Sequence, residues 1–378
     1  MSTRSRTLRL GTRGSDLALR QAAAVKERLE RRRQTVELVE VETTGDRITD
    51  ELVHRLGKTG AFVRDLDEEV LAGEVDAAVH SMKDMPTEMP DDLVVAGVPE
   101  RGPARDLLLT PEGVALSDLP EGATVGTASL RRGAQLLAER PDLDVQPLRG
   151  NVDTRVEKLL APSLQREHER RTDAEAGSGA SDGETGGETG ATDDGDSDAD
   201  FDRSVEAWFD DLAEIERRAL ERAVDVEYDA IVLAEAGLER SGLLHHVSHA
   251  RLPTDRFVPS PGQGALAVTA VDGDLATDLR EALDHPHTRV ETTVERTVLA
   301  ELGGGCIAPI GVYAILQGSV VRATVRVLDR DGDSEVRETR ELPVERHRRA
   351  AREFAADLAD RGAADLIARA RKRAAEES

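Results

Sequence analysis

The chain has 378 residues and a formal net charge of -25 at pH 7, which argues against a nucleic-acid partner because phosphate binding needs a basic surface. No apolar run approaches the roughly 20 residues of a membrane span, and the first residues lack the apolar core of a signal peptide, so we expect a cytoplasmic protein without a membrane partner. A single cysteine excludes an internal disulfide, which fits a reducing compartment.

The first part of the chain alternates short strands with amphipathic helices. Residues 7–13 are typical of a strand, and 15–33 of a helix capped by Ser15, with apolar side chains at helical spacing. A second predicted helix ends at Gly73, and the buried strand after it opens into the loop 81–86. The βαβαβ order predicts a parallel sheet with helices on both faces, where ligands bind beyond the carboxyl ends of the strands.

The same alternation returns after residue 104, and a third block with a helix, alternating strands and a last helix begins near His285. We therefore expect an α/β protein of two doubly wound domains and a small α+β C-terminal domain. The expected boundaries are 1–104 with a return segment at 262–284, then 105–261, then 285–378.

One segment breaks the alternation. Residues 173–200 contain no Lys or Arg and no aliphatic side chain larger than Ala, so they cannot bury enough apolar surface to order themselves. We expect a disordered acidic insert over about residues 165–205, with an interaction tail as the alternative. Because arginine far outnumbers lysine and acidic residues dominate, the composition also suggests the surface of a halophilic protein.

Four arginine-bearing turns fall at predicted strand ends. Guanidinium groups match carboxylates and phosphates in bidentate geometry, and helix N-termini add backbone donors. For each arginine the alternative is a solvated surface position, but two of them lie in a first helical turn, where the dipole disfavours cations unless an anion is present. We favour an anion-binding cleft formed by Arg13 with Ser15, Arg131 with Arg132, Arg149, and Arg155.

The loop "SMKDMP" carries the sharpest local signal. Ser81, Lys83 and Asp84 follow a buried strand at its carboxyl end, where a charged pair is more often functional than structural. Lys83 is one of only five lysines in a chain that otherwise uses arginine. The alternative is a purely structural ion pair between Lys83 and Asp84.

Cys306 follows three glycines, Gly303 to Gly305, in "ELGGGCIAPIG". A glycine loop lets backbone approach a ligand and leaves the sulfur accessible, which favours a reactive or attached thiol. The alternative is that Cys306 is a small buried apolar residue. We expect no metal site, because the histidines at 245, 246 and 249 lack an obvious fourth ligand.

Eight motifs, in one order over nearly the whole chain outside the acidic insert, resemble the porphobilinogen deaminase family. They are "RLGTRGSDLALRQA", "DAAVHSMKDMPTEMP", "RDLLLT", "VGTASLRRGAQLLAERPDL", "LRGNVDTRVEKL", "YDAIVLAEAGLERSGL", "PSPGQGALAV" and "ELGGGCIAPIG". The resemblance implies two doubly wound domains facing each other like those of periplasmic binding proteins, with a third domain presenting Cys306 to the cleft. It also implies a transferase of tetrapyrrole biosynthesis, which condenses four porphobilinogens into linear hydroxymethylbilane and releases four ammonia.

The resemblance further implies a dipyrromethane cofactor, attached through a thioether to Cys306, and a role for Asp84 as the catalytic aspartate that stabilises positive charge on a pyrrole nitrogen. The other expected cofactor-binding residues are Ser81, Lys83, Thr127, Ser129, Arg131, Arg132 and Gly150, and the expected substrate-binding residues are Arg13, Ser15, Arg149, Arg155, Arg240 and Gln263. Lys58 and Phe62 match a mobile lid, although Thr59 stands where the family usually carries the lysine. We expect a monomer, and a direct hand-off of product to a uroporphyrinogen III synthase is a further hypothesis.

Two other functions remain as alternatives. An anion-binding clamp of the same architecture would perform no chemistry and would carry no attached pyrrole. An acidic interaction protein would use the insert as a partner tail, and its function would survive mutation of Lys83 and Asp84.

Overall fold

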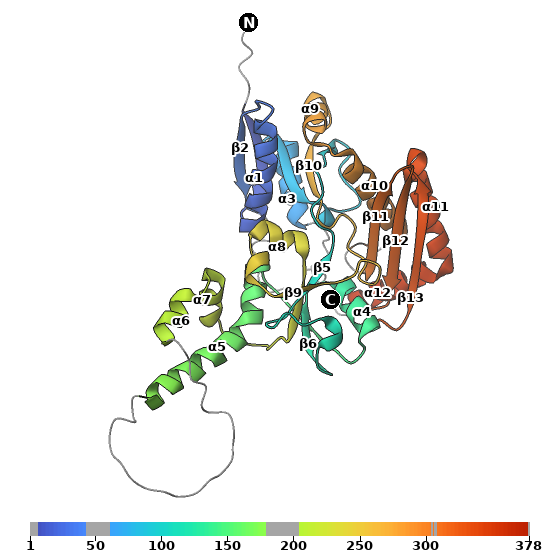
Figure 1. The fold of residues 1–378 in the computed structure, drawn as a ribbon. Helices are drawn as coiled ribbons and strands as arrows, with labels where there is room; N and C mark the ends of the chain where they lie inside the picture. The colour runs from blue at the N-terminus through green and yellow to red at the C-terminus, as the bar shows by residue number, and fades with distance from the viewer. Residues whose placement is uncertain (1–6, 43–60, 179–203, 304, 306–307, 377–378) are drawn as a thin grey trace, which may run out of the picture.

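The computed structural model describes residues 7–42, 61–178, 204–303, 305 and 308–376. These residues form three β-sheets, and each sheet with the helices packed against it is called a unit here. In Figure 1 the first unit lies at the top, the second below it and the third to the right. The expected α/β class, with a small α+β unit at the C-terminus, is confirmed. Within the described part of the chain, no helix combines the length and the apolar character needed to cross a membrane.

The first sheet has the strand order β2-β1-β3-β10-β4. Strands β1 and β2, and β1 and β3, pair in parallel, whereas β10 runs antiparallel to both of its neighbours. The prediction of a parallel sheet is therefore wrong for β10, because the chain returns from the second unit and starts β10 opposite Ser81, at the carboxyl end of β3. The elements are β1 Leu8–Arg13, α1 Asp16–Glu30, β2 Val36–Val41, α3 Ala61–Ala72, β3 Ala77–Ser81, β4 Leu93–Gly97, β10 Leu266–Val271 and α9 Asp274–Leu283.

Local signals set the helix ends in this unit as the sequence predicts. The Ser15 side chain caps α1 by accepting a hydrogen bond from the Ala18 amide at 3.4 Å. Gly73 follows the last residue of α3 with a φ of +76°, a backbone conformation that favours glycine at a helix end. Val25 and Leu29 of α1 are buried in the core beside the sheet.

The second sheet has the order β7-β6-β8-β5-β9. Strand β6 runs parallel to β7 and β8, whereas β5 runs antiparallel to β8 and β9. Strands β6, β7 and β8 are each followed by a helix, so three helix starts lie beyond their carboxyl ends. The elements are β5 Asp106–Leu109, β6 Thr124–Thr127, α4 Leu130–Glu139, β7 Asp144–Pro147, α5 Val152–Ser178, β8 Ala230–Ala234, α8 Glu235–Ser241 and β9 His249–Arg251.

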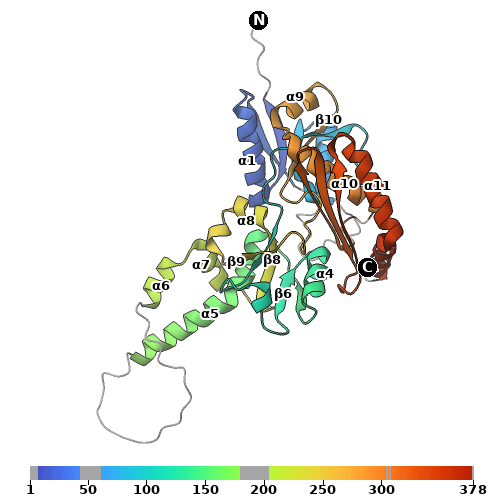
Figure 2. The same cartoon turned by 45° about the vertical axis from the view of Figure 1, so that its right-hand side comes forward.

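Helix α5 extends away from the second sheet, and the short helices α6 (Val205–Asp211) and α7 (Glu214–Leu220) lie along it (Figure 2). The expectation of disorder from about residue 165 is wrong for residues 165–178, which continue α5. Glu167 pairs with Arg171 at 2.8 Å, one turn along, and such pairs support a polar helix. The Arg171 guanidinium also lies 5.4 Å from the centre of the Trp208 ring of α6. Residues 179–203 of the expected insert lie outside the described residues, and Ser204 and Val205 cap and begin α6.

The third unit is a three-stranded antiparallel sheet covered by helices. Phe354 is fully buried in its core. The unit contains α10 Pro286–Leu302, β11 Ile310–Gln317, β12 Val320–Leu328, β13 Glu335–Pro343, α11 His347–Leu358 and α12 Ala364–Glu376.

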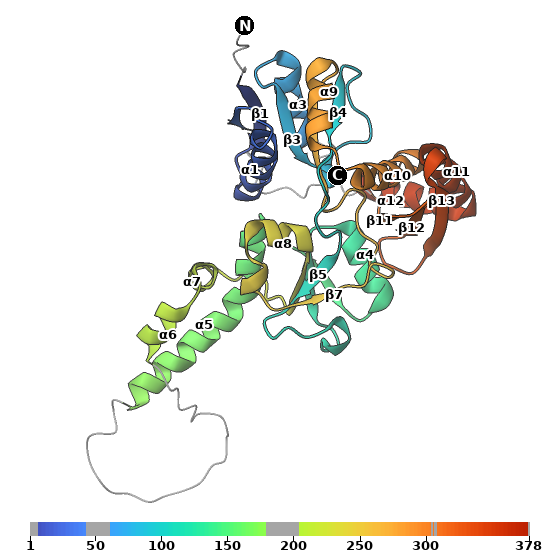
Figure 3. The same ribbon diagram turned by 45° about the horizontal axis from the view of Figure 1, so that its top comes forward.

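A buried carboxylate, Glu295, joins the linkers of the first two units to the third. Its oxygens accept two hydrogen bonds from the Arg101 guanidinium, at 2.8 and 3.0 Å. They also accept bonds from the backbone amides of Gly262 and Ala314, at 2.7 and 2.9 Å. Since Arg101 and Gly262 lie on different linkers and Ala314 lies on β11, this side chain fixes the third unit to the connections between the first two sheets. Figure 3 shows α10 and β11 of the third unit beside these connections.

Candidate functional site

A pocket lies between the first two sheets, at the ends of their strands. The first sheet contributes the ends of β1 and β3, and the second contributes the end of β8 and the starts of α4, α5 and α8. The linker residues Gln263 and Gly264 complete the lining. Of the residues that the sequence predicted for the site, the pocket brings together Arg13, Ser15, Ser81, Lys83, Asp84, Arg132, Arg155, Arg240 and Gln263.

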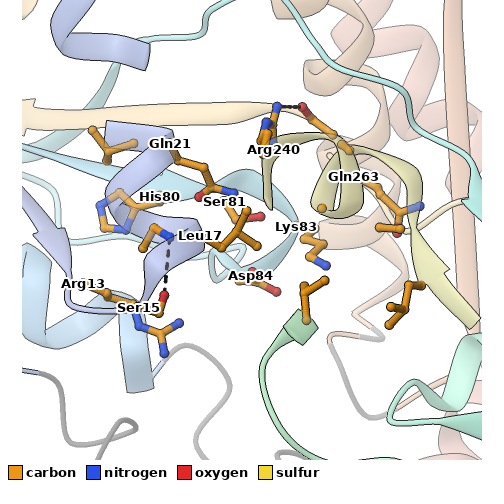
Figure 4. A pocket seen from close by; sticks show the side chains of 18 of the residues that line it. Arg13, Ser15, Leu17, Gln21, His80, Ser81, Lys83, Asp84, Arg240 and Gln263 are labelled. Carbon is orange, nitrogen blue, oxygen red and sulfur yellow. Dashed lines mark hydrogen bonds between the residues drawn. The ribbon is translucent and has the colours of Figure 1, made fainter. Parts of the chain in front are cut away.

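A single turn of 3₁₀ helix, Met82–Asp84, presents Lys83 and Asp84 to this pocket. The flanking Met82 and Met85 are buried and hold the turn against the core. The Met82 amide donates a hydrogen bond to the Ala265 carbonyl at 3.0 Å, which fixes the turn to the returning linker. Lys83 is half-buried and Asp84 is exposed, and Figure 4 shows their side chains between Arg13 and Ser15 on one side and Arg240 and Gln263 on the other.

Positive charge accumulates around Lys83. Asp84 raises the pKa of Lys83, but burial together with the nearby guanidinium groups of Arg132 and Arg155 outweighs this effect and lowers the pKa below its usual value. Burial, followed by the charge of Arg132, also lowers the pKa of Arg155 to about 10. Cations that disfavour one another's charge in this way favour the binding of anions.

The two arginines at the start of α4 share a buried carboxylate, Asp106. Arg132 donates to one Asp106 oxygen through Nε at 3.0 Å and Nη2 at 2.7 Å, and Arg131 donates to the other at 2.8 Å. The Gln263 amide adds a bond to Asp106 at 2.9 Å. Burial alone would raise the pKa of Asp106, but the two guanidinium groups hold it well below its usual range.

Asp106 is the main site residue that sequence reasoning missed. The sequence predicts an anion beside the two arginines in the first turn of α4, and the Asp106 carboxylate of the chain itself is part of that negative charge. The available signal was the position of Asp106 at the start of the buried run "DLLL", where an unpaired carboxylate would be costly. Two guanidinium groups against one carboxylate still leave one net positive charge beside the pocket.

Three predicted cofactor-binding residues position the arginines in the structure and do not line the pocket. Thr127 accepts a hydrogen bond from the Ser129 amide at 3.2 Å, and Ser129 caps α4 by accepting one from the Arg132 amide at 3.4 Å. The Gly150 carbonyl accepts a bond from Arg155 Nε at 2.8 Å. These contacts fix the starts of α4 and α5 and hence the directions of Arg132 and Arg155.

Arg131 and Arg149 also lie outside the pocket lining. Arg131 is buried, and its Nη1 donates to the Val258 carbonyl at 2.8 Å. Among the described residues, its Nε has no hydrogen-bond partner. Arg149 is half-buried.

The expected anchor, Cys306, and the expected lid residue Lys58 lie outside the described residues, as does the side chain of Phe62. Gly303 ends α10 with a φ of +68°, where glycine is favoured. The Gly303 carbonyl accepts a hydrogen bond from Arg371. On the other side of Cys306, Ala308 precedes β11 and is buried.

Comparison with known proteins identifies two family models in this chain. The model described as "Porphobilinogen deaminase, dipyromethane cofactor binding domain" matches residues 8–167 and 213–278. The model described as "Porphobilinogen deaminase, C-terminal domain" matches residues 290–360. The first model therefore omits residues 168–212, which include the end of α5 and all of α6.

Curated relatives match over nearly the full length. A protein from Halobacterium salinarum named "Probable porphobilinogen deaminase" is 59% identical, covering 98% of this chain and 100% of its own length. Proteins named "Porphobilinogen deaminase" from Rubrobacter xylanophilus and Sulfurimonas denitrificans are 38% and 34% identical, each covering at least 95% of both chains. Among solved structures, a periplasmic substrate-binding protein from Coxiella burnetii aligns with 74% of this chain and 92% of its own, at 13% identity and a TM-score of 0.34.

Proposed function

Since this chain belongs to the porphobilinogen deaminase family, we propose that the pocket between its first two sheets is the active site and that Asp84 is its catalytic residue. Enzymes of this family are transferases that join four porphobilinogens into linear hydroxymethylbilane, with release of four ammonia, in tetrapyrrole biosynthesis. One observation supports the assignment most strongly. Among the described residues that line the pocket, Asp84 is the one carboxylate, and Arg13, Lys83, Arg132, Arg155 and Arg240 surround it as cations.

The cations match the acid arms of the substrate, because each porphobilinogen carries an acetate and a propionate. We propose that Arg13, Ser15, Arg149, Arg155, Arg240 and Gln263 bind these groups, the arginines through guanidinium forks that suit carboxylates. Arg13 and Ser15 come from the first sheet and Arg149, Arg155 and Arg240 from the second, so a bound ring would be held from both sides. Arg240 is directed by its hydrogen bond to the Gly264 carbonyl at 2.6 Å.

The residues present also fit a dipyrromethane cofactor, which the matching family model names. The buried Nε of Arg131 has no hydrogen-bond partner in the described part of the chain, and we propose that it donates to an acid arm of the cofactor, although Arg131 does not line the pocket as it stands. We propose that Ser81, Lys83, Asp84, Arg131 and Arg132 face the cofactor and that Cys306 carries it covalently. Thr127, Ser129 and Gly150 would hold Arg132 and Arg155 in place. When bound, the dipyrromethane supplies the free pyrrole position to which the first substrate ring is joined.

Asp84 would act electrostatically on the substrate. As ammonia leaves the aminomethyl carbon, positive charge develops over the pyrrole nitrogen, and a carboxylate nearby stabilises it. Because Asp84 is exposed, the effective dielectric lies between protein and water values, and at about 4 Å the attraction is about 1–4 kcal/mol. If that attraction is realised only in the transition state, it accelerates the reaction by about one to three powers of ten.

The role of Asp84 is tested by substitution. We expect Asp84→Ala to abolish nearly all turnover and Asp84→Glu to retain a little, because glutamate keeps the charge but moves it. Glu88→Gln is a matched control, since Glu88 is exposed and follows the same turn without lining the pocket. Turnover by Asp84→Ala at the rate of the Glu88→Gln control would refute the assignment.

Intact mass tests the cofactor separately from the rate. The purified wild type should weigh more than its amino acids by one dipyrromethane, and Cys306→Ala should not. An unmodified wild type that gains nothing from added porphobilinogen would favour the anion-binding clamp.

We propose the remaining features of the protein from its sequence. They are the three-domain division given above, a monomer in a cytoplasm of high salt, and transfer of hydroxymethylbilane to a uroporphyrinogen III synthase. The acidic composition and the 59% identity to a protein from Halobacterium salinarum support the salt adaptation. Sedimentation of the purified protein, alone and mixed with the synthase, tests the monomer and the transfer complex.

A further inference from the structure

The turn that carries Lys83 and Asp84 is held from behind by an arginine of the third unit. Arg296 of α10 donates through Nη1 to the carbonyls of Met82 and Met85, each at 3.3 Å, and through Nη2 to the Pro86 carbonyl at 2.5 Å. These carbonyls stand on both sides of Lys83 and Asp84 in the sequence. One planar guanidinium therefore fixes the backbone immediately before and immediately after the two charged residues.

Among the described residues, Arg296 donates its hydrogen bonds to backbone carbonyls alone. No carboxylate within the described ranges forms an ion pair with Arg296, and burial lowers the pKa of its guanidinium. A half-buried cation with no ionic partner gives up solvation, and three carbonyl acceptors compensate for that loss. Arg296 does not line the pocket, so it has no direct contact with a ligand bound there.

Arg296 also connects two parts of the site that lie far apart in the sequence. It is separated from Met82 by 214 residues. The same helix, α10, ends at Leu302, with Gly303 after it and Cys306 three residues further along the chain. The helix that precedes the expected anchor is thus the helix that holds the turn of Asp84.

We propose that Arg296 is a positioning residue for Asp84, an inference that rests on the proposed function of the pocket. It keeps the Met82–Asp84 turn at a fixed distance from the helix that leads to the cofactor anchor. Because a displacement of about 1 Å at a reacting group can reduce a rate about 100-fold, the loss of Arg296 should act on catalysis more than on binding. The acid arms of the substrate would still be held by Arg13, Arg155 and Arg240.

Helix α10 offers a matched control in Arg289, seven residues earlier and close to the same face of the helix. Arg289 also donates to backbone carbonyls of the first unit, Val95 at 3.1 Å and Ala96 at 3.2 Å, and pairs with Asp284. These contacts reach β4 and its end, away from the pocket lining. Arg289→Gln thus removes a comparable bridge between units without touching the turn.

The experiment compares Arg296→Gln, Arg296→Lys and Arg289→Gln in the full-length enzyme with its cofactor, whose occupancy is measured by intact mass. We expect Arg296→Gln to lower kcat about 10- to 100-fold with KM changed less than about twofold, and Arg296→Lys to recover part of that loss. We expect Arg289→Gln to lower the thermal midpoint while kcat stays within about twofold of wild type. In an Asp84→Glu background, which keeps some turnover, Arg296→Gln should cause less further loss of kcat than it does in the wild type, because both substitutions act on one group.

Several outcomes overturn the inference. They are a kcat of Arg296→Gln equal to that of Arg289→Gln, a rise in KM with unchanged kcat, or a full additional loss of kcat in the Asp84→Glu background. If Arg296→Gln does not fold, the folded Arg296→Lys decides, and a wild-type kcat in that variant overturns the proposal. A wild type without attached dipyrromethane, or an active Asp84→Ala, would instead refute the proposed function itself.

Discussion

Replacing Asp106 with asparagine should destabilise the second unit strongly. The substitution keeps the shape of the side chain but removes the negative charge that Arg131 and Arg132 share at 2.8 and 2.7 Å. Asp106 is fully buried, and both arginines are nearly so, so water cannot replace the lost partner. Breaking a buried ion pair from one side typically costs about 3–5 kcal/mol, which corresponds to a fall in thermal midpoint of roughly 6–20 °C for a domain of this size.

The pH dependence of stability gives the same reasoning a second test. Because the folded pKa of Asp106 lies well below its unfolded value near 4, its contribution is present at neutral pH and is lost as the pH falls below about 4. The wild type should therefore lose stability more steeply below about pH 4 than Asp106→Asn, which has no carboxylate to protonate at that position.

A surface pair in the same unit provides the control for both measurements. Asp142 pairs with Arg140 through two hydrogen bonds, at 2.6 and 2.7 Å, and solvent reaches this pair. Calorimetry or circular dichroism should find little change in midpoint for Asp142→Asn, because exposed pairs contribute little. Equal midpoints for Asp106→Asn and Asp142→Asn would refute the reasoning that burial makes the Asp106 cluster critical.

Three further changes test the site and the insert. Because its pKa is lowered, Lys83 loses its charge at a lower pH than an ordinary lysine, so kcat/KM should fall at alkaline pH. Lys83→Arg should move this alkaline fall in the pH profile to higher pH, since arginine keeps its charge. If the alkaline fall does not move, it belongs to the substrate amine. In urea titrations, Gly150→Ala should lower the free energy of unfolding more than Gly122→Ala. Both glycines have a positive φ, which costs a residue with a Cβ about 1–2 kcal/mol. Only at Gly150 would the new Cβ also clash with a neighbour, Thr154 Cγ2 at 2.4 Å. Deleting residues 179–203 should leave kcat at high salt unchanged, because no described residue between Arg155 and Leu233 lines the pocket, and a large loss of turnover at high salt would contradict this expectation.

The sequence predicted the types of element and many of their ends because those depend on nearby residues. Ser15 and Gly73 delimit helices through contacts within a few residues, and hydrophobic periodicity distinguished helix from strand in both α/β units. Composition misplaced the start of the acidic insert. Residues 165–178 stay helical through pairs such as Glu167 with Arg171, which a count of apolar residues does not register.

For the candidate site, sequence patterns placed Lys83, Asp84 and the arginines at strand ends, and the structure brings most of them to one pocket. The sequence did not predict which of them line that pocket. Ser129 and Gly150 hold neighbouring arginines, and Arg131 is directed toward Asp106 and the Val258 carbonyl. Such distinctions depend on side-chain directions, which local pattern does not determine.

By itself, the sequence determined the chemical character of this protein: a set of motifs shared with its family, arginines at strand ends, and one carboxylate in the short loop after a buried strand. Tertiary structure alone decided the reversed direction of β10, the sharing of Asp106 by two arginines, and the support of the Asp84 turn by Arg296. The physical reason is separation along the chain. Asp106 lies 26 residues from Arg132, and Met82 lies 214 residues from Arg296, so only folding brings these charges and carbonyls together.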